Sequence, residues 1–412
     1  MKLLILTQYY PPETGAPQVR LSELAQRLQQ KGVYVSVLTA MPNYPQMIIH
    51  KQYKGKCFCK EQINKVNVYR SWIYVPQSKA MIKRLLNYFS FVLSSFWYGI
   101  FKIKGKYDIL FVESPPLFLG ITAYLLAKFK RAKLVFNVSD LWPESAERLG
   151  LITNRSLLKM ATWLEEFCYK KSFLITGQTQ GIVNNIKNRF PFKRVHWLKN
   201  GIDVGYYEKD EKFVKGLWRV ENKFAEDDFI LFYGGIIGYA QGLDVILYAA
   251  EKLKNYNNIK FVVLGSGPEK QRLVDMKNNL DLVNVYFFDA VEKKKMRQII
   301  EDIDASIIPL KRLELFKGAI PSKIFESLAL RKPVLLGVEG EAKELFIDNG
   351  DCGLAFEPEN SENLCKQILY LYSNKEDAEK MGENGLKYVS QNFSLSKITE
   401  DFYMELQKNR DI

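Results

Sequence analysis

Two charged residues in the second half of the chain, Lys323 and Glu326, lie one helical turn apart on a segment that Pro321 opens. A lysine ammonium group can neutralise a phosphate, and a glutamate carboxylate can accept hydrogen bonds from both hydroxyls of a ribose. With Ser322 beside them, these residues suit a phosphorylated nucleoside. The same spacing also fits a solvent-exposed ion pair on a helix surface, which is the commoner outcome for such a pattern.

Glycines follow two predicted strands of the same half, where backbone amides can come close to a phosphate. The loop in residues 232–243 joins a strand to an amphipathic helix and can cradle a diphosphate. The Gly-Ser-Gly-Pro segment in residues 265–268 suits the close approach of a nucleotide base. Glycine loops have many uses, so each segment is moderate support for a nucleotide site. The polar and glycine positions of interest here are Gly234, Gly235, Gly238, Gln241, Gly265 and Gly267.

In the first half, a polar segment in residues 137–145 follows a predicted buried strand and carries Asp140, Trp142 and Glu144. It places two carboxylates, an indole and hydroxyl groups at the carboxyl end of a strand, where α/β sheets bind ligands. The aspartate can steer or deprotonate a substrate hydroxyl. Alternatively, Asp140 caps the helix that follows, and the spacing alone slightly favours this structural role.

The loop between the first strand and the first helix contains Gly15 and Pro17. Gly15 permits a close approach of the backbone, and Pro17 suits the first turn of a helix whose free N–H groups attract anions. An ordinary long turn is the alternative. Nicotinamide binding is disfavoured because no Gly-x-Gly-x-x-Gly sequence follows this strand.

Short apolar or β-branched runs alternate with amphipathic helical segments along the chain, which predicts parallel sheets with helical crossovers. The turn-like Asn200–Asp203 and the charged stretch after it separate two such series. We therefore predict an α/β protein of two Rossmann-like, doubly wound domains, residues 1–203 and 204–392. The predicted strands are residues 2–6, 33–40, 66–70, 108–112, 133–138, 173–176 and 194–198, and then 229–234, 259–265, 283–289, 305–310 and 332–337.

The 412-residue chain carries a net charge of +13, which points to anionic lipid, nucleic acid or a phosphorylated substrate as partner. No recognised nucleic-acid-binding module is present, which disfavours nucleic acid. Two histidines and five cysteines without paired zinc spacing predict reduced thiols and no metal site. The first residues do not resemble a signal peptide, so we expect a cytoplasmic protein.

Residues 79–106 contain six Lys or Arg residues and no acidic residue. The apolar run Leu85–Phe101 is interrupted by four polar residues, which makes it marginal for crossing a bilayer. Its basic flanks and aromatic residues suit a helix that lies in the interface of an anionic leaflet. A helix packed on the sheet of its domain is the alternative.

Taken in order, these segments resemble the donor-site signatures of the retaining family-4 glycosyltransferases with the B-type fold, over nearly the whole chain. The resemblance implies two domains that face each other across a cleft, and a C-terminal helix, residues 393–412, that packs back on the first domain. It also implies a nucleotide-sugar donor and a catalytic role for Asp140 and Lys323. The implied donor-binding residues are Gly15, Gly234, Gly235, Gly238, Gln241, Gly265, Gly267, Ser322, Lys323 and Glu326.

Residues 8–13, 41–45, 140–145 and 240–243 resemble one branch more closely, the L-fucosamine (N-acetyl-L-fucosamine) transferases of bacterial O-antigen, capsule and colanic-acid synthesis. This resemblance implies transfer from UDP-N-acetyl-L-fucosamine to a lipid-linked saccharide. We expect no metal cofactor, because the chain offers no plausible metal cluster, and we expect a peripheral enzyme at the inner face of the cell membrane, because of the basic segment 79–106 and a lipid-linked acceptor. The residues assigned to the acceptor side are Asn43, Tyr44, Trp142 and Glu144.

The sequence departs from the family pattern at three places. Ser139 stands where many members have a histidine, and Gly318 replaces the first glutamate of a pair whose second member is Glu326. Gly235 and Gln241 lie near the usual positions of an arginine and a lysine. Other groups must then balance the negative charge of the phosphates. The candidates are loop amides, Lys323, Arg20 and Lys311.

Retaining transfer in this fold is usually written as a front-face substitution, in which the leaving diphosphate deprotonates the acceptor hydroxyl. The protein then mainly positions the reactants and stabilises the departing charge. A missing histidine is compatible with this chemistry. Two alternatives stay open at this point: a two-domain sugar-nucleotide epimerase, and a non-catalytic subunit that binds a nucleotide sugar.

Overall fold

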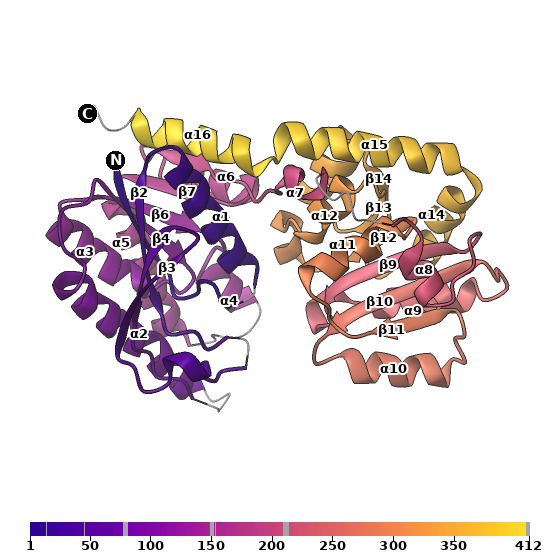
Figure 1. Cartoon of the computed structure of the whole chain (residues 1–412), viewed down its shortest axis with the longest axis horizontal. Helices are drawn as coiled ribbons and strands as arrows, with labels where there is room; N and C mark the ends of the chain where they lie inside the picture. The colour runs from indigo at the N-terminus through magenta and orange to yellow at the C-terminus, as the bar shows by residue number, and fades with distance from the viewer. Residues whose placement is uncertain are drawn as a thin grey trace. The chain divides into compact units, whose positions relative to one another are not determined.

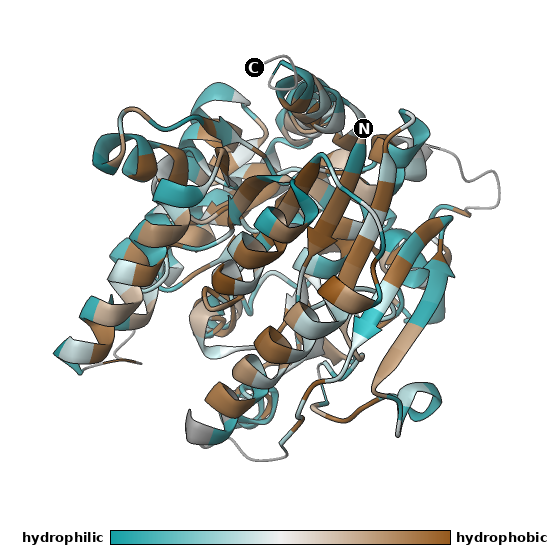
Figure 2. Ribbon diagram, turned by 90° about the vertical axis from the view of Figure 1, so that its left-hand side faces the viewer, coloured by the Kyte–Doolittle hydropathy of each residue, from teal (hydrophilic) through white to brown (hydrophobic). Residues whose placement is uncertain are grey.

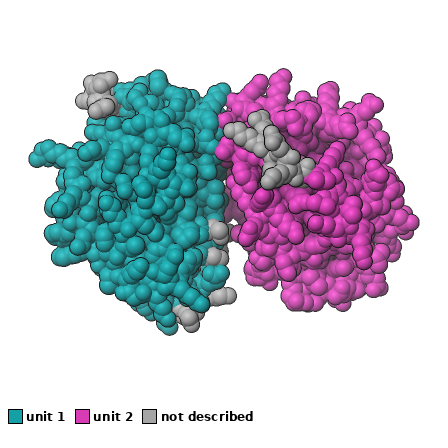
Figure 3. All heavy atoms as spheres, viewed as in Figure 1, with its two compact units in different colours: residues 1–200, 395–412 teal, residues 201–394 magenta. Residues whose placement is uncertain are grey.

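The computed structural model describes residues 1–13, 15–44, 46–76, 81–148, 152, 154–208 and 214–408, apart from the side chains of residues 81, 82 and 84. The chain forms two compact units, shown in different colours in Figure 3. Unit 1 consists of residues 1–200 and 395–412, and unit 2 of residues 201–394. The chain thus passes from unit 1 to unit 2 after Asn200 and returns at Leu395.

Unit 1 contains a sheet with eight strands in its described part, in the order β3-β4-β2-β1-β5-β6-β7-β8. All neighbours pair in parallel except β3, which is antiparallel to β4. Its strands are β1 Lys2–Leu6, β2 Tyr34–Ala40, β3 Phe58–Ile63, β4 Val66–Ser71, β5 Ile109–Ser114, β6 Lys133–Val138, β7 Leu174–Gly177 and β8 Val195–Trp197. Its helices are α1 Ala16–Gln30, η1 Lys51–Tyr53, α2 Met81–Phe101, α3 Leu119–Lys130, α4 Glu144–Arg148, α5 Arg155–Lys171, α6 Gln180–Arg189 and α16 Leu395–Gln407.

The alternation of side chains along β1 explains why helices cover both faces of this sheet. Leu3 and Ile5 contribute to a core that includes residues of α1 and α16, whereas Leu4 and Leu6 contribute to a core that includes residues of α2, α3 and α5. Every second side chain of a strand points to the same face, so an uninterrupted apolar run supplies two cores. In Figure 1, α1 and α16 lie side by side in unit 1, and Phe402 of α16 packs 5.9 Å from Phe111 of β5.

Unit 2 contains a parallel sheet with the order β11-β10-β9-β12-β13-β14 in its described part. Its strands are β9 Phe229–Ile236, β10 Ile259–Ser266, β11 Val285–Phe288, β12 Ala305–Pro309, β13 Val334–Gly337 and β14 Gly353–Ala355. Its helices are α7 Val204–Glu208, α8 Leu217–Glu221, η2 Tyr239–Gln241, α9 Asp244–Lys252, α10 Lys270–Asn279, α11 Lys293–Glu301, η3 Glu314–Gly318, α12 Lys323–Ala329, α13 Glu341–Lys343, η4 Glu344–Asn349, α14 Ser361–Ser373 and α15 Lys375–Asn392.

The predicted α/β class with two Rossmann-like parallel sheets is confirmed. The sequence reasoning found twelve of the strands and did not predict β3 or β14. β3 alternates polar and apolar residues at the antiparallel edge of its sheet, and β14 is only three residues long. Both lack the apolar run by which buried parallel strands are recognised.

Candidate active site

Lys323, the first residue of α12, points its amine at the end of β9. Its Nζ donates a hydrogen bond to the hydroxyl of Tyr233 over 3.0 Å, and that hydroxyl donates to the carbonyl of Ile236. A Cβ on Gly235 would stand 3.1 Å from the same Nζ, so a glycine there leaves room for the amine. Burial lowers the pKa of Lys323 to about 8. Desolvation disfavours the charged form of a lysine that lacks a close anion.

Glu326 lies one turn further along α12, and no ion pair joins these two described side chains. Its hydrogen-bond partner is the hydroxyl of Tyr207, a buried residue of α7. Burial raises the pKa of the Glu326 carboxyl, although the cations Lys293 and Lys323 oppose that shift. The spacing alone favoured an exposed ion pair between Lys323 and Glu326, and the structure does not contain that pair. Tyr207 is a residue that the sequence reasoning missed.

Gly265 and Gly267 are required by the close approach of β10 to the end of β9. A Cβ on Gly265 would stand 1.8 Å from the carbonyl oxygen of Gly235, and one on Gly267 would stand 2.1 Å from that of Ile237. These contacts are with backbone, which cannot move aside as a flexible side chain can. The packing of two neighbouring strand ends is thus by itself a sufficient reason for both glycines.

Of the predicted glycine loop, Gly234 and Gly235 lie within β9, because the strand continues to Ile236 in pairing with β10. Gly238 precedes the short helix η2, and a Cβ on it would lie 2.9 Å from Oε1 of Gln241. Gly234 faces the ring of Phe232. Lys311, which we considered as a substitute cation, lies with its amine 3.2 Å from the centre of the Tyr239 ring and donates its backbone N–H to the carbonyl of Ala240. Ser322 is exposed at the start of α12 and makes no side-chain capping bond.

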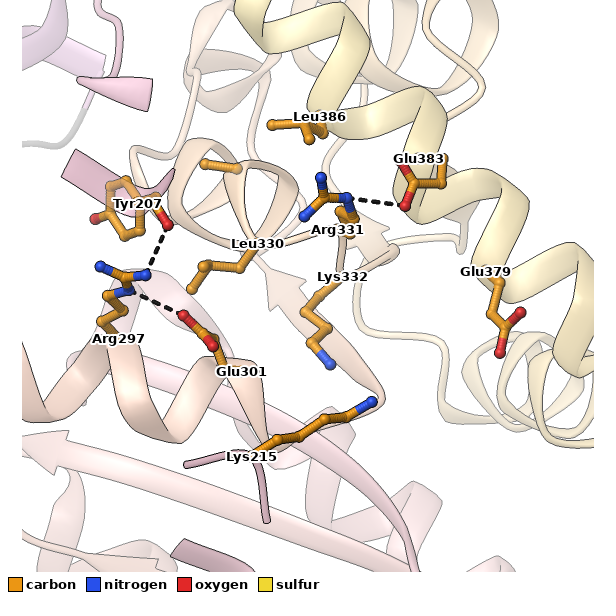
Figure 4. Close-up of a pocket in the computed structure, with 11 residues that line it drawn as sticks. Tyr207, Lys215, Arg297, Glu301, Leu330, Arg331, Lys332, Glu379, Glu383 and Leu386 are labelled. Atoms are coloured by element: carbon orange, nitrogen blue, oxygen red, sulfur yellow. Dashed lines mark hydrogen bonds and ion pairs between the residues drawn. The ribbon is translucent and has the colours of Figure 1, made fainter. Parts of the chain in front are cut away.

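A polar pocket of about 540 Å³ in unit 2 is lined by residues of α7, α11, α12 and α15 (Figure 4). Arg297 donates to the carbonyl oxygens of Tyr206 and Tyr207 over 3.0 and 2.7 Å and pairs with Glu301 at 2.9 Å. It therefore fixes the backbone of the residue whose hydroxyl reaches Glu326. None of the predicted site residues lines this pocket.

In unit 1, a buried polar network joins the carboxyl ends of β5, β6 and β7 to α1. Arg20 pairs with Glu113 at 2.5 Å and also donates to Ser139 over 3.1 Å. Asn137 donates to the second oxygen of Glu113 over 2.7 Å and accepts from Thr176 over 2.6 Å. Arg20, which we considered as a phosphate cation, is thus already matched by a carboxylate of its own unit.

Glu113 is the centre of this network, and the sequence reasoning did not name it. The sequence did contain a signal for this network. Glu113, Asn137 and Thr176 are polar residues in three mainly apolar strands, and they are direct neighbours in the register of the sheet. A buried carboxylate needs charge or hydrogen-bond partners, so polar residues in adjacent buried strands should pair. Ser139 at the usual histidine position belongs to the same network, since its hydroxyl donates to Glu113.

Asp140 follows Ser139 and is partly exposed. Its carboxylate accepts a hydrogen bond from the hydroxyl of Ser145, in the first turn of α4. Asp140 therefore reaches a side chain of that helix and does not cap its backbone N–H groups. Trp142 packs edge-on against Phe118 at 6.4 Å, and Glu144 forms a 2.6 Å ion pair with Arg148 on the surface.

Glu13 ties two loops of unit 1 together. One of its oxygens accepts from the backbone N–H groups of Asn43 and Tyr44 over 2.8 and 2.9 Å, and the other accepts from that of Tyr10 over 3.2 Å. Burial raises the pKa of Glu13. Asn43 is buried, whereas the ring of Tyr44 is exposed and lies 5.5 Å from that of Tyr9. Gly15 stands just before α1.

Within the part of the chain that the structure describes, no three His, Cys, Asp or Glu side chains are grouped as a metal site would require. All five cysteines are free thiols, and Cys168, Cys352 and Cys365 are buried.

Comparison with known proteins identifies the class of enzyme. The family described as "Glycosyl transferase 4-like domain" matches residues 15–201, and the family "Glycosyl transferases group 1" matches residues 214–388. The structure superposes on those of glycosyltransferases, among them HepE of Anabaena in complex with UDP-glucose, with a TM-score of 0.71, 16% identity and coverage of 99% and 100% of the two chains. WaaG, a glycosyltransferase of lipopolysaccharide synthesis, gives a TM-score of 0.65 at 18% identity, covering 97% and 99%.

The chain is therefore a glycosyltransferase with the GT-B fold, and it is a nucleotide-sugar-dependent transferase. Among curated proteins it is similar to the putative colanic acid biosynthesis glycosyl transferase WcaI of Escherichia coli, with 26% identity over 377 residues, which are 89% of this chain and 91% of that protein. It is also 20% identical to the O-antigen chain mannosyltransferase C of Escherichia coli over 98% of this chain and 97% of that protein.

Proposed function

We propose that this enzyme is a retaining glycosyltransferase of bacterial surface polysaccharide synthesis. In this proposal it transfers N-acetyl-L-fucosamine from its UDP donor to a lipid-linked saccharide. The observation that carries the proposal is the pair on α12, a half-buried Lys323 that forms no ion pair with a described carboxylate and a half-buried Glu326 one turn away. The names of the colanic-acid and O-antigen relatives support the pathway class, and the UDP-bound structural relative supports a uridine nucleotide.

In the proposed donor complex, the Lys323 ammonium group binds the diphosphate and the Glu326 carboxylate accepts hydrogen bonds from the two ribose hydroxyls. The loop amides around Gly235 and Gly238 supply further donors to the phosphates. In the free enzyme the amine of Lys323 is desolvated, and no described carboxylate pairs with it. The donor phosphate therefore favours the charged form of the amine without displacing another anion. The electrostatic gain is larger at a half-buried site than in open water.

The proposed reaction proceeds on one face of the sugar. The acceptor hydroxyl oxygen forms a bond to the anomeric carbon from the side on which the bond to the diphosphate breaks. The proton of the hydroxyl passes to the departing diphosphate, whose negative charge Lys323 stabilises. Asp140 steers the acceptor hydroxyl, and the side chains of Asn43, Tyr44, Trp142 and Glu144 are proposed to contact the acceptor saccharide.

A nucleotide screen by thermal denaturation tests the donor assignment. A ligand that binds only the native state stabilises it by about 2.7 kcal/mol at a hundred times its Kd. UDP should therefore raise the melting temperature, and ADP and GDP at equal concentration should not. Stabilisation by a purine nucleotide alone would refute the uridine donor.

Donor turnover with and without a lipid-linked saccharide then separates the proposed transferase from the two alternatives. A transferase consumes UDP-N-acetyl-L-fucosamine only when the acceptor is present. An epimerase would release free sugar without an acceptor, and a binding subunit would consume no donor under either condition.

We also propose that the enzyme works as a peripheral protein at the inner face of the cell membrane, through residues 79–106. Residues 79 and 80 lie outside the described residues, and residues 81–106 form α2 and the turn after it. Among the described residues, no helix has both the length and the apolar character needed to cross a bilayer. A lipid-linked acceptor makes surface docking useful, because it confines enzyme and substrate to the same plane.

A further inference from the structure

The outer face of α2 exposes an unusual number of large apolar side chains. They recur every three or four residues and therefore form one stripe along the helix. Its inner face is buried, as Phe91 and Ser95 show, so α2 is packed on the sheet while its outer side stays exposed. The stripe consists of Leu86, Phe89, Leu93, Trp97 and Phe101, of which Leu93 is 70% and Trp97 61% exposed.

Helix α3 packs beside α2 and adds a second row of exposed apolar residues. Figure 2 turns this side of unit 1 toward the viewer and shows brown, apolar residues along its helices. The row on α3 consists of Ile121, Leu125 and Phe129. We call the stripe and this row together the α2–α3 face. Contiguous exposed apolar surface of this kind marks an interaction site.

The charged side chains of α2 and α3 are all basic. Residues 62–107 and 114–139, which include both helices, contain no aspartate or glutamate. Exposed cations beside the face include Lys83, Lys102, Lys128 and Arg131. A protein partner would need an apolar surface with acidic surroundings, whereas an anionic bilayer offers both properties over any area.

A hollow of about 600 Å³ adjoins the C-terminal end of α2. We call it the lysine hollow, and no acidic residue is among those that line it. Lys102, which directly follows Phe101 of the stripe, lies 6.0 Å from the ring centre of Phe58, and Lys60 lies 5.6 Å from that of Tyr69. None of its lysines forms an ion pair with a described carboxylate. The lining residues are Lys2, Tyr34, Phe58, Lys60, Tyr69, Lys102, Lys104, Lys106 and Tyr107.

Five lysines around one hollow repel one another unless an anion is present, and their amines are the donors that phosphate oxygens accept. We infer that the α2–α3 face docks on the surface of an anionic bilayer, with lipid phosphate groups bound in the lysine hollow. The inference deepens the membrane part of the proposed function and extends the contact to residues of β1, β3 and α3. Binding to lipid can be measured without sugar transfer, so the two proposals can fail separately.

The docked face is connected to the acceptor side of unit 1. Phe89 of the stripe packs 4.8 Å from Phe118, which packs against Trp142. Asn87 accepts a hydrogen bond over 3.0 Å from Gln8, in the loop that follows β1. A bilayer in contact with the stripe would thus lie next to the elements proposed to bind a lipid-linked saccharide.

Sedimentation with vesicles tests the inference, using neutral phosphatidylcholine and the same lipid with one third phosphatidylglycerol. The full chain should bind the anionic vesicles and bind the neutral ones far more weakly. The variant Lys60→Glu/Lys104→Glu/Lys106→Glu should lose on the order of a hundredfold in affinity for anionic vesicles, because each basic residue near such a surface contributes substantially. High salt should weaken wild-type binding in the same direction.

A matched control carries the same charge change on unit 2, at the exposed residues Lys294, Lys366 and Lys380. If this control loses as much affinity as the hollow variant, overall charge and not the hollow is responsible, and the inference is overturned. The variant Leu93→Ser/Trp97→Ser should remove the binding that persists in high salt, because apolar burial is insensitive to salt. Equal binding of wild type to both kinds of vesicle, or to neither, would also overturn it.

Two further measurements test which kind of phosphate the lysine hollow binds and whether the hollow variant is folded. Inorganic phosphate at millimolar concentration should not displace the enzyme from vesicles, since it replaces only one of many contacts. Displacement would mean that the hollow binds free phosphate and not a lipid surface. The stabilisation by UDP should be unchanged in the hollow variant, which shows that unit 2 is folded and that lipid and donor bind separately.

Discussion

The amine of Lys323 lies 3.0 Å from the hydroxyl of Tyr233 and 4.2 Å from the centre of that ring. The neighbouring Gly235 offers no side chain, and Glu326 acts on the amine only at longer range. The amine of Lys323 is therefore half-buried and hydrogen-bonded to an uncharged group, the hydroxyl of Tyr233. This relationship is the reason why we propose Lys323 as the cation that binds the diphosphate of the donor.

The affinity for UDP should fall as the pH rises through about 8. Burial depresses the pKa of Lys323 to about 8 in the free enzyme, so the amine is mostly charged below that pH and mostly neutral above it. A bound diphosphate favours the charged form, and each pH unit above 8 should cost up to about tenfold in affinity. Titration calorimetry between pH 7 and 9.5 measures this, because phosphate ionisation near pH 6 is then complete.

Lys323→Gln is the matched variant for that titration, since it keeps a polar side chain without a titrating group. Its UDP affinity should be lower at pH 7 and nearly independent of pH. A wild-type slope that persists in the variant would assign the pH dependence to another group.

Replacement of Glu326 should weaken UDP binding by about 2–4 kcal/mol, the range for losing a charged hydrogen-bonding partner at a buried site. The variant Glu326→Ala removes the ribose contact but leaves the phosphate contacts. Inorganic pyrophosphate should therefore bind the variant and the wild type about equally. Tyr207→Phe, which removes only the hydroxyl that bonds Glu326, should have a smaller effect of the same sign. Undiminished UDP affinity in Glu326→Ala would refute the ribose role.

Asp140→Asn should lower kcat by about 10²–10⁴-fold, the range for removing a group that handles a proton or steers a hydroxyl. The UDP affinity should stay the same, because the side chains proposed to bind the ribose and the diphosphate, Glu326 and Lys323, lie in unit 2. Ser145→Ala is the control, since it removes the hydrogen-bond partner of Asp140 and keeps the carboxylate. Steady-state kinetics with saturating donor distinguishes the two, and full activity of Asp140→Asn would remove it from the catalytic residues.

Glu113→Ala should destabilise the protein by about 3–5 kcal/mol, because it leaves the buried Arg20 and Asn137 without their carboxylate. Urea denaturation followed by tryptophan fluorescence measures the change. The control is Glu166→Ala, which removes an exposed ion pair with Lys170 and should cost less than about 1 kcal/mol. Similar losses in both variants would show that the network contributes no more than a surface pair.

Transferase activity should survive an excess of EDTA, because the proposed chemistry stabilises the leaving diphosphate with Lys323 and loop amides. The assay is donor turnover after dialysis against the chelator, with and without added Mg²⁺. An absolute requirement for a divalent ion would show that the described residues do not meet the phosphate charge by themselves.

The strands were predictable where one local pattern was sufficient. β1 and β6 lie where the sequence predicted them, because a run of apolar residues must be buried on both faces of a parallel sheet. β3 was not predictable in this way, since its partner β4 and its edge position come from the arrangement of the whole sheet. Asp140, Gly235 and Lys323 could be placed at a strand end or a helix start for the same local reason.

Only the tertiary structure decided how the side chains of those loops are used. The spacing of Lys323 and Glu326 alone favoured a surface ion pair, and the fold instead places Tyr233 beside the lysine and Tyr207 beside the glutamate. Likewise, Arg20 could have been a free cation until Glu113, 93 residues away in the chain, neutralised it. The sequence by itself determined the α/β fold and the strand ends, because these follow from the period of apolar residues. It could not determine the pairing of charges, because a charge is satisfied by whichever group the packing of distant segments brings within hydrogen-bond distance.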